Sequence, residues 1–159
     1  MSTFFRFVQF LSLGLWLGSD VFLSFVVAPG AFRVLASRDQ AGAIVGYSLG
    51  LMHAGGVICG TVFLLALLFR ARTFGSLVSP AALCVVLMMA LTEVSQLAVS
   101  PRMSVLRGQM GSIQATAEGN ALLAEFTRLH SISVSLETGV LLAGFAALYL
   151  MVREFSQLS

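Results

Sequence analysis

Four long apolar runs constrain the fold of this sequence more than any other feature. They cover about residues 4–28, 42–69, 80–99 and 126–151, and each is close to the roughly 20 residues that an α-helix needs to cross a bilayer. Of the 159 residues, 58% are hydrophobic and only 10% are charged, against roughly 25% charged residues in an ordinary soluble domain. The sequence therefore predicts an integral, multi-pass membrane protein.

Short connections between these runs predict an all-α fold, a four-span antiparallel transmembrane helix bundle that forms a single domain over residues 1–159. Both termini should then lie on one side of the membrane, and the connections after Pro29 and Pro101 on the other. Residues 102–118 carry an apolar stripe at helical spacing, which predicts a short interfacial helix between spans three and four. A helix folded back over the mouth of the bundle is the alternative.

Local signals place the ends of the spans. Pro29 should end or kink the first span, because proline disfavours the helical conformation in the residue before it. Ser37 with Gln40 three residues later resembles a capping box, which starts the second helix shortly after the serine. Ser79 followed by Pro80 gives a similar start for the third span.

Polar side chains interrupt each apolar run at nearly the same depth. At about 1.5 Å of rise per residue, the ionisable ones lie about 20–26 Å from the terminus-side end of their spans. A charge at bilayer depth is costly and is normally retained where it lines a cavity or meets a partner. The sequence therefore predicts a polar intramembrane pocket on the loop side, lined by Asp20, His53, Glu93, Gln96 and Glu137.

Glycines predict that His53 faces the interior of the bundle. His53 shares a helix face with Gly46, Gly56 and Gly60, and small residues at that spacing let helix backbones approach closely in lipid. Three further side chains lie nearer the loop-side surface. We expect these to form the mouth of the pocket: Arg33, Arg102 and His130.

Three carboxyl groups at one level cannot all be ionised without compensation, and three sources of compensation are open. Arginines from the loop side would make the layer a capped structural plug. A divalent metal ion held by His53, Glu93 and Glu137 would make it a metal site. A carboxyl group or His53 that takes up and releases a proton would make it a transport site. Haem is disfavoured, because His53 and His130 differ in depth by about 9 Å.

Charge and cysteine content bear on partners. Nine arginines and no lysine are spread over the connections and both termini, so no basic strip supports nucleic-acid binding. Cys59 and Cys84 fall inside spans, where they are interpreted as small apolar residues. The expected partners are membrane lipid and, through the Gly-rich second span, a second copy of the chain or another membrane protein.

Several segments resemble one family of membrane proteins. They are LWLGSDVFLSFVVAPGAFRVL in the first span, SPRM after the third, and AEFTRLHSISVSLETGVLLAG in the fourth. Over nearly its whole length the chain is similar to the transmembrane-protein-205-like family, whose bacterial members are catalogued as a domain of unknown function. The resemblance implies a four-helix protein, located in a bacterial inner membrane, with no settled activity.

These observations favour a transporter component or a membrane binding protein over an enzyme. We expect it to handle a small molecule, a metal ion or a proton in the polar pocket. One alternative is a membrane-embedded metal- or haem-dependent oxidoreductase that uses the same layer. A second alternative is an accessory subunit of a membrane complex.

Overall fold

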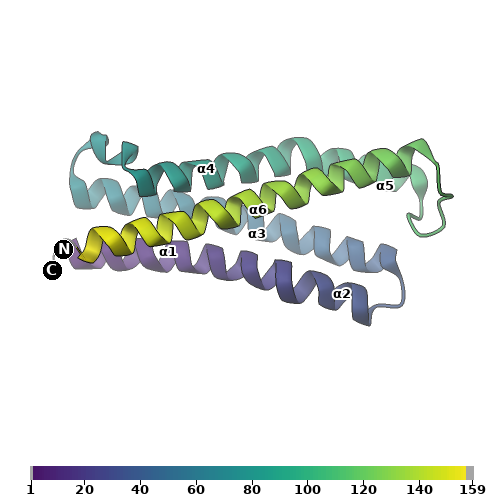
Figure 1. Ribbon diagram of the computed structural model, residues 1–159, viewed down its shortest axis with the longest axis horizontal. Helices are drawn as coiled ribbons and strands as arrows, with labels where there is room; N and C mark the ends of the chain where they lie inside the picture. The colour runs from purple at the N-terminus through teal and green to yellow at the C-terminus, as the bar shows by residue number, and fades with distance from the viewer. Residues whose placement is uncertain (1, 157–159) are drawn as a thin grey trace.

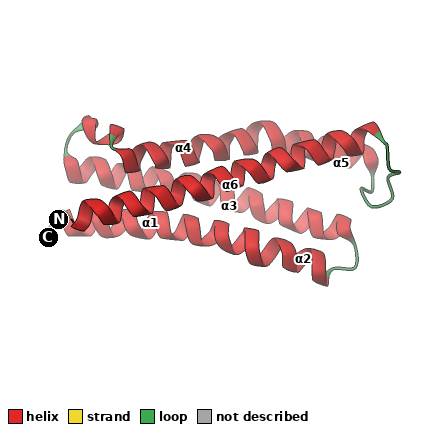
Figure 2. Ribbon diagram, viewed as in Figure 1, coloured by secondary structure: helices red, strands yellow, loops and turns green. Residues whose placement is uncertain are grey.

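The computed structural model describes residues 2–156 of the chain. Within them η1 and η3 are π-helical turns, η2 is a 3₁₀ turn, and no strand occurs (Figure 2). In chain order the elements are α1 (Ser2–Phe22), η1 (Leu23–Val27), α2 (Ala28–Val34), α3 (Arg38–Ala71), η2 (Phe74–Val78), α4 (Pro80–Val94), η3 (Ser95–Val99), α5 (Ser100–Met110) and α6 (Ala121–Ser156).

These elements join into four long rods that form an up-and-down bundle (Figure 1). The rods cover Thr3–Val34, Arg38–Ala71, Pro80–Met110 and Ala121–Glu154, and each is long and apolar enough to cross a membrane. The start of α1, the end of α6 and the α3–α4 connection lie at one end, which we call the terminus end. The other two connections lie at the opposite, loop end. The predicted four-span bundle is thus confirmed.

The helix starts predicted from serine are confirmed by side-chain caps. Ser37 Oγ accepts a hydrogen bond from the amide of Gln40 at 3.4 Å, and α3 begins at the next residue. Ser79 Oγ accepts from the amide of Ala82 at 3.4 Å, with Pro80 opening α4. Each cap satisfies an amide that has no partner within its own helix.

The first and third rods continue past their prolines, further than predicted. The expected spans stopped at residues 28 and 99, whereas helix continues to Val34 and Met110. A π-helical turn precedes each proline, and the amides of Ala28 and Ser100 each bond to the carbonyl five residues earlier. A proline ring clashes with the carbonyl four residues before it in an α-helix. The wider turn moves that carbonyl aside, so the helix can continue.

The short helix expected after span three is present as α5, but it extends the third rod (Figure 1). It ends at Met110 instead of near residue 118, and α6 begins at Ala121, earlier than the predicted residue 126. Gly111 and Gly119 lie in the connection with φ angles of 67° and 89°. Glycine adopts such angles at little cost, and Gly111 is the residue that caps the end of α5.

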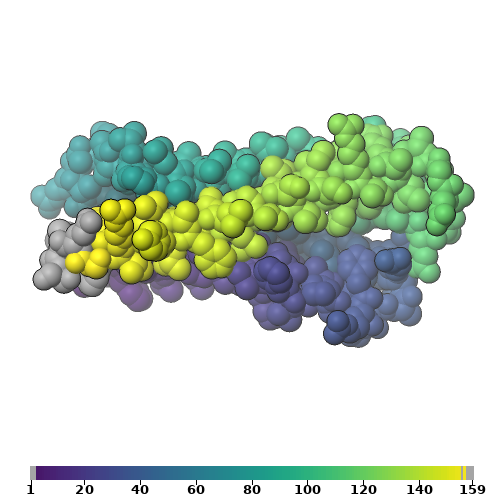
Figure 3. Space-filling view, viewed as in Figure 1, coloured from purple at the N-terminus to yellow at the C-terminus, as the bar shows by residue number. Residues whose placement is uncertain are grey.

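An apolar core fills the half of the bundle nearer the terminus end. In the loop half, α2 packs against α3 and α5 packs against α6, and Figure 3 shows a furrow between α2 and α6 on the face in view. The core comes from all four rods: Leu13, Trp16, Leu17, Phe63, Leu67, Ala81, Ala82, Val85, Met88, Val140, Ala143, Ala147 and Met151. The core ends near the level at which the buried polar side chains begin.

Asp39 ties the α5–α6 connection to the start of α3. Its carboxylate accepts hydrogen bonds from Ser112 Oγ at 2.5 Å and from the amide of Ile113 at 2.9 Å. The amide of Arg38 also donates to Gln114 Oε1 at 3.2 Å. Polar contacts therefore hold the two connections of the loop end together.

We expect Asp39→Ala to release this connection, because two hydrogen bonds to a charged acceptor are lost. In lipid nanodiscs, proteolytic cleavage within residues 111–120 should become faster by about tenfold. Glu118→Ala is the matched control, since the side chain of Glu118 is exposed in the same connection. Equal cleavage of the two variants would show that Asp39 does not restrain the loop.

Candidate functional site

His53 lies at the centre of a buried polar site. It belongs to α3 and is 1% exposed. Its Nδ1 lies 2.9 Å from Gln96 Oε1 in η3, and its Nε2 lies 2.5 Å from Glu137 Oε1 in α6. An amide oxygen only accepts hydrogen bonds, so Nδ1 carries a hydrogen and donates it to Gln96. The contact with Glu137 then holds one shared proton, and the pair is neutral overall wherever that proton resides.

Asp20 adds a second carboxyl group from α1. It is 0% exposed, its Oδ1 accepts from Ser24 Oγ at 3.3 Å, and it lies within electrostatic range of Glu137 and His53. An isolated carboxylate in apolar surroundings is very costly. Asp20 therefore needs either a proton or a cation nearby. We call Asp20, His53, Gln96 and Glu137 the polar site.

Several buried polar atoms at or beside the polar site have no hydrogen-bond partner within residues 2–156. Thr92 and Ser95 are 1% and 0% exposed and precede Gln96 along the third rod. Buried polar groups in native proteins are nearly always hydrogen-bonded, so such atoms indicate where a water molecule, a proton or a ligand belongs. They are Trp16 Nε1, Asp20 Oδ2, Thr92 Oγ1, Ser95 Oγ and Glu137 Oε2.

Glycines in α3 bring α1 close enough to complete the site. Trp16 precedes Asp20 by one helical turn, and its indole lies directly against Gly56 and Gly60. A Cβ atom on Gly56 would lie 2.4 Å from Trp16 Nε1, and one on Gly60 would lie 2.9 Å from Trp16 Cζ3. The predicted close approach along the glycine face of His53 is confirmed, because only glycine leaves room for this ring.

The structure does not bring Glu93 into the polar site. Its side chain is partly exposed and forms no ion pair with any other described residue. Glu93 lies three residues before Gln96, which places the two on one face of a regular α-helix. The π-helical turn η3 begins at Ser95, between the two residues, and only Gln96 contacts His53.

The metal site predicted from His53, Glu93 and Glu137 is accordingly not assembled. In the described part of the chain, no group of three or more His, Cys, Asp or Glu side chains is placed to hold a metal ion. Both ring nitrogens of His53 are already engaged, one by Gln96 and the other by Glu137.

The predicted mouth residues lie at the surface. Arg33 and His130 are exposed, and Arg102 Nη2 forms a surface ion pair with Glu125 Oε1 at 2.8 Å. Among residues 2–156, no arginine is paired with a carboxyl group of the polar site. The capped plug that the sequence left open is therefore not formed by these side chains.

Arg107 of α5 lies in the loop half of the bundle, where the sequence predicted that Arg33 and Arg102 would form the mouth of the pocket. A Cβ on Gly42 of α3 would lie 3.2 Å from its Nη2, and its Cζ lies 5.7 Å from the ring centre of Phe126. Further along the same helix, Gly50 faces the amide of Gln96. Glycines of α3 thus face Arg107 near the loop end and Gln96 at the polar site. In the sequence, Gly42, Gly46 and Gly50 recur at four-residue spacing, and small residues leave room for a large neighbour.

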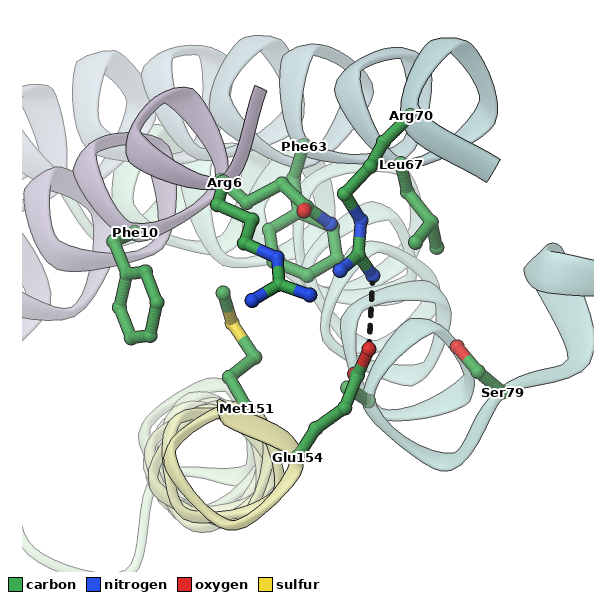
Figure 4. Close-up of a pocket in the computed structure, with 10 residues that line it drawn as sticks. Arg6, Phe10, Phe63, Leu67, Arg70, Ser79, Met151 and Glu154 are labelled. Carbon is green, nitrogen blue, oxygen red and sulfur yellow. Dashed lines mark hydrogen bonds and ion pairs between the residues drawn. The ribbon is translucent and has the colours of Figure 1, made fainter. Parts of the chain in front are cut away.

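A separate pocket lies at the terminus end of the bundle (Figure 4). There Arg70 Nη2 donates to Glu154 Oε1 at 3.1 Å, and the guanidinium of Arg6 points into the same space. This pocket differs from the polar site in that guanidinium groups line it. The pocket is lined by Arg6, Gln9, Phe10, Phe63, Leu67, Arg70, Ser79, Ala81, Met151 and Glu154.

Comparison with known proteins identifies a family without an activity. A family model described as a domain of unknown function (DUF4149) matches residues 11–112. The matched segment includes Asp20, His53 and Gln96 and ends before Glu137. No curated protein and no solved structure matches the chain.

Proposed function

The chain belongs to the DUF4149 family, a domain of unknown function, and we propose from its polar site that it is a transporter component that takes up and releases a proton inside the membrane. The observation that carries this proposal is the contact of buried His53 with both Gln96 and Glu137, to which Asp20 adds a second carboxyl group that is fully buried. Intramembrane ionisable groups of this kind mark proton relays and ion pathways.

The number of bound protons sets the charge of the polar site. With an imidazolium, one carboxylate and one carboxylic acid, the site is neutral. One more proton makes its charge +1, and one fewer makes it −1. Neutrality is favoured in apolar surroundings, so a change in protonation must accompany the entry of water or of a counter-charge. Affinity for a charged cargo therefore depends on the proton count.

The position of the site supports exchange with the loop side. The apolar core closes the terminus half of the bundle, whereas the rods separate toward the loop end (Figure 3). The π-helical turn η1 begins just after Asp20, and η3 contains Gln96. Such turns recur at functional sites and are places where helices kink. Bending at both turns would hydrate the polar site while the core stays closed.

The same geometry favours transport over the two alternatives. A metal-dependent oxidoreductase needs several ligands on one ion, and the described residues hold no such group. A haem enzyme with two histidine ligands needs both on one iron, but His53 is buried and His130 is exposed. An accessory subunit would use its outer faces and would give the buried polar side chains no role.

We expect purified protein in lipid vesicles to carry protons when a membrane potential is imposed, measured with a pH-sensitive dye inside the vesicles. His53→Gln should reduce the flux by about a hundredfold, because it removes a positioned proton-transfer group. His130→Gln is the matched control and should keep the flux, since His130 is exposed. Wild-type flux no greater than that of empty vesicles, or unchanged by His53→Gln, would refute the proposal.

We further propose that this family relationship extends to the transmembrane-protein-205-like proteins and that the chain works in a bacterial inner membrane. The resemblance is most specific in segments 28–33, 101–102 and 126–133. The first two segments lie directly after the π-helical turns η1 and η3, and the third lies in α6.

A further inference from the structure

The unused atoms of the polar site are mainly hydrogen-bond acceptors. Asp20 Oδ2 and Glu137 Oε2 are buried carboxyl oxygens without a partner among the described residues. Thr92 and Ser95 add two hydroxyl oxygens in the same condition. A carboxylate only accepts, and a hydroxyl offers two lone pairs for one hydrogen. A ligand that donates several hydrogen bonds complements this set.

The charge of the polar site selects a positive ligand. The inward-facing donors of His53 are already used, one by Gln96 and the other by Glu137. When the imidazolium and both carboxylates are ionised, the site carries a charge of −1. One bound monovalent cation then restores neutrality, as one proton does in the empty site.

Charged side chains near the polar site do not cancel its preference for a cation. From the loop end, Arg107 lies against Gly42, beyond Gln96. On the third rod, Glu93 is partly exposed and unpaired among the described residues, and on α6 His130 is exposed. No cation of residues 2–156 is thus bonded to the free oxygens of Asp20 and Glu137.

Enclosure limits the ligand to a small cation, and a nearby aromatic side chain favours an ammonium group. Asp20 and His53 are 0% and 1% exposed, so a ligand at this level is surrounded by protein. Trp16 lies one turn from Asp20 on the same face of α1. Aromatic rings attract ammonium groups, best when both are shielded from water.

We propose that the polar site binds a small ammonium-type cation, either ammonium or a short primary alkylammonium, between Asp20 and Glu137. This inference rests on the proposed function and names its cargo class. As the cation binds, the carboxylic acid of the site releases its proton to water, and the total charge of the site stays the same. The apparent affinity should therefore rise about tenfold per pH unit while the empty site retains that proton.

Calorimetric titration of the full chain in lipid nanodiscs with methylammonium chloride tests the proposal. We expect saturable binding with one proton released per cation, measured in buffers of different ionisation enthalpy. Propionate is an organic anion of similar size and should bind, if anywhere, in the arginine-lined pocket of the terminus end (Figure 4). No saturable methylammonium binding, or tighter binding of sodium than of methylammonium, would overturn the assignment.

Variants locate the cation. Asp20→Asn keeps the shape of the side chain and should weaken methylammonium binding at least about tenfold, with no proton release. Thr92→Val should weaken binding less, and Thr61→Val is its control because Thr61 is exposed and bonds only to its own helix. Binding unchanged in Asp20→Asn would refute the site, provided that circular dichroism shows the same helix content.

The proposal of proton transport and the proposal of an ammonium site can be refuted independently. If vesicles show His53-dependent proton flux but methylammonium does not bind, the proton function stands and the ammonium assignment is refuted. If methylammonium binds with proton release but no flux occurs, the cation site stands and transport is refuted. Flux that rises when methylammonium is present on the opposite side would support both proposals.

Discussion

Glu137→Ala should lower the free energy of unfolding by about 3 kcal/mol, because it leaves His53 Nε2 buried without its partner. Breaking a buried ion pair from one side typically costs about 3–5 kcal/mol. The unfolded state of a membrane protein also lies in lipid and finds other partners, which favours the lower end of that range. Unfolding in mixed micelles can be followed by the fluorescence of Trp16, the only tryptophan, which is buried.

Two comparisons make this result specific to the buried pair. Glu125→Ala removes a carboxylate from the exposed ion pair with Arg102 and should change stability little, because surface pairs contribute little. The double variant Glu137→Leu with His53→Leu should be less destabilised than Glu137→Ala alone, since neither charge remains unpaired. If Glu137→Ala unfolds like wild type, His53 and Glu137 are not bonded.

The depth of the polar site could be predicted from sequence because it depends on one number, the rise per residue of a helix. His53, Gln96 and Glu137 come from three different rods and contact one another, as that depth and the glycine face of α3 indicated. Asp20 of a fourth rod lies within electrostatic range of them. Their facing was predictable as well, since an ionised side chain directed at lipid is too costly to retain.

The different surroundings of Glu93 and Gln96 could not be predicted. Their spacing indicates one shared helix face, yet only Gln96 contacts His53, and a π-helical turn begins between them at Ser95. The prolines that mark these turns were visible in the sequence, but their local signal favoured helix ends. Helix continues through both because lipid leaves no water to bond the backbone groups that a break would expose.

The direction of the arginine side chains was also beyond sequence reasoning. Arg102 turns outward because Glu125, on another helix, supplies a carboxylate at 2.8 Å. Arg107 turns toward α3 because Gly42 leaves space there and Phe126 offers an aromatic face. Long flexible side chains follow such tertiary partners, and no local pattern identifies those partners.

Gly56→Ala should destabilise the protein by about 3 kcal/mol, because the new methyl group cannot be accommodated. It would lie 2.4 Å from Trp16 Nε1 and 2.5 Å from Trp16 Cε2, well inside van der Waals contact. Trp16 is 1% exposed and rigid, so the ring or the whole of α1 must move. Overpacking of a dense core costs about 1–3 kcal/mol, and movement of α1 also separates Asp20 from His53.

The adjacent glycine is a stringent control. A Cβ on Gly55 meets nothing within 4 Å, so Gly55→Ala should leave stability unchanged or raise it by up to about 1 kcal/mol through better helix propensity. Trp16→Phe shortens the ring at the point of overlap and should partly rescue Gly56→Ala, measured by circular dichroism. Similar losses at Gly55 and Gly56 would show that α1 and α3 are not in close contact. Asp20 would then have no fixed position opposite His53, and neither proton transfer nor cation binding could proceed as described.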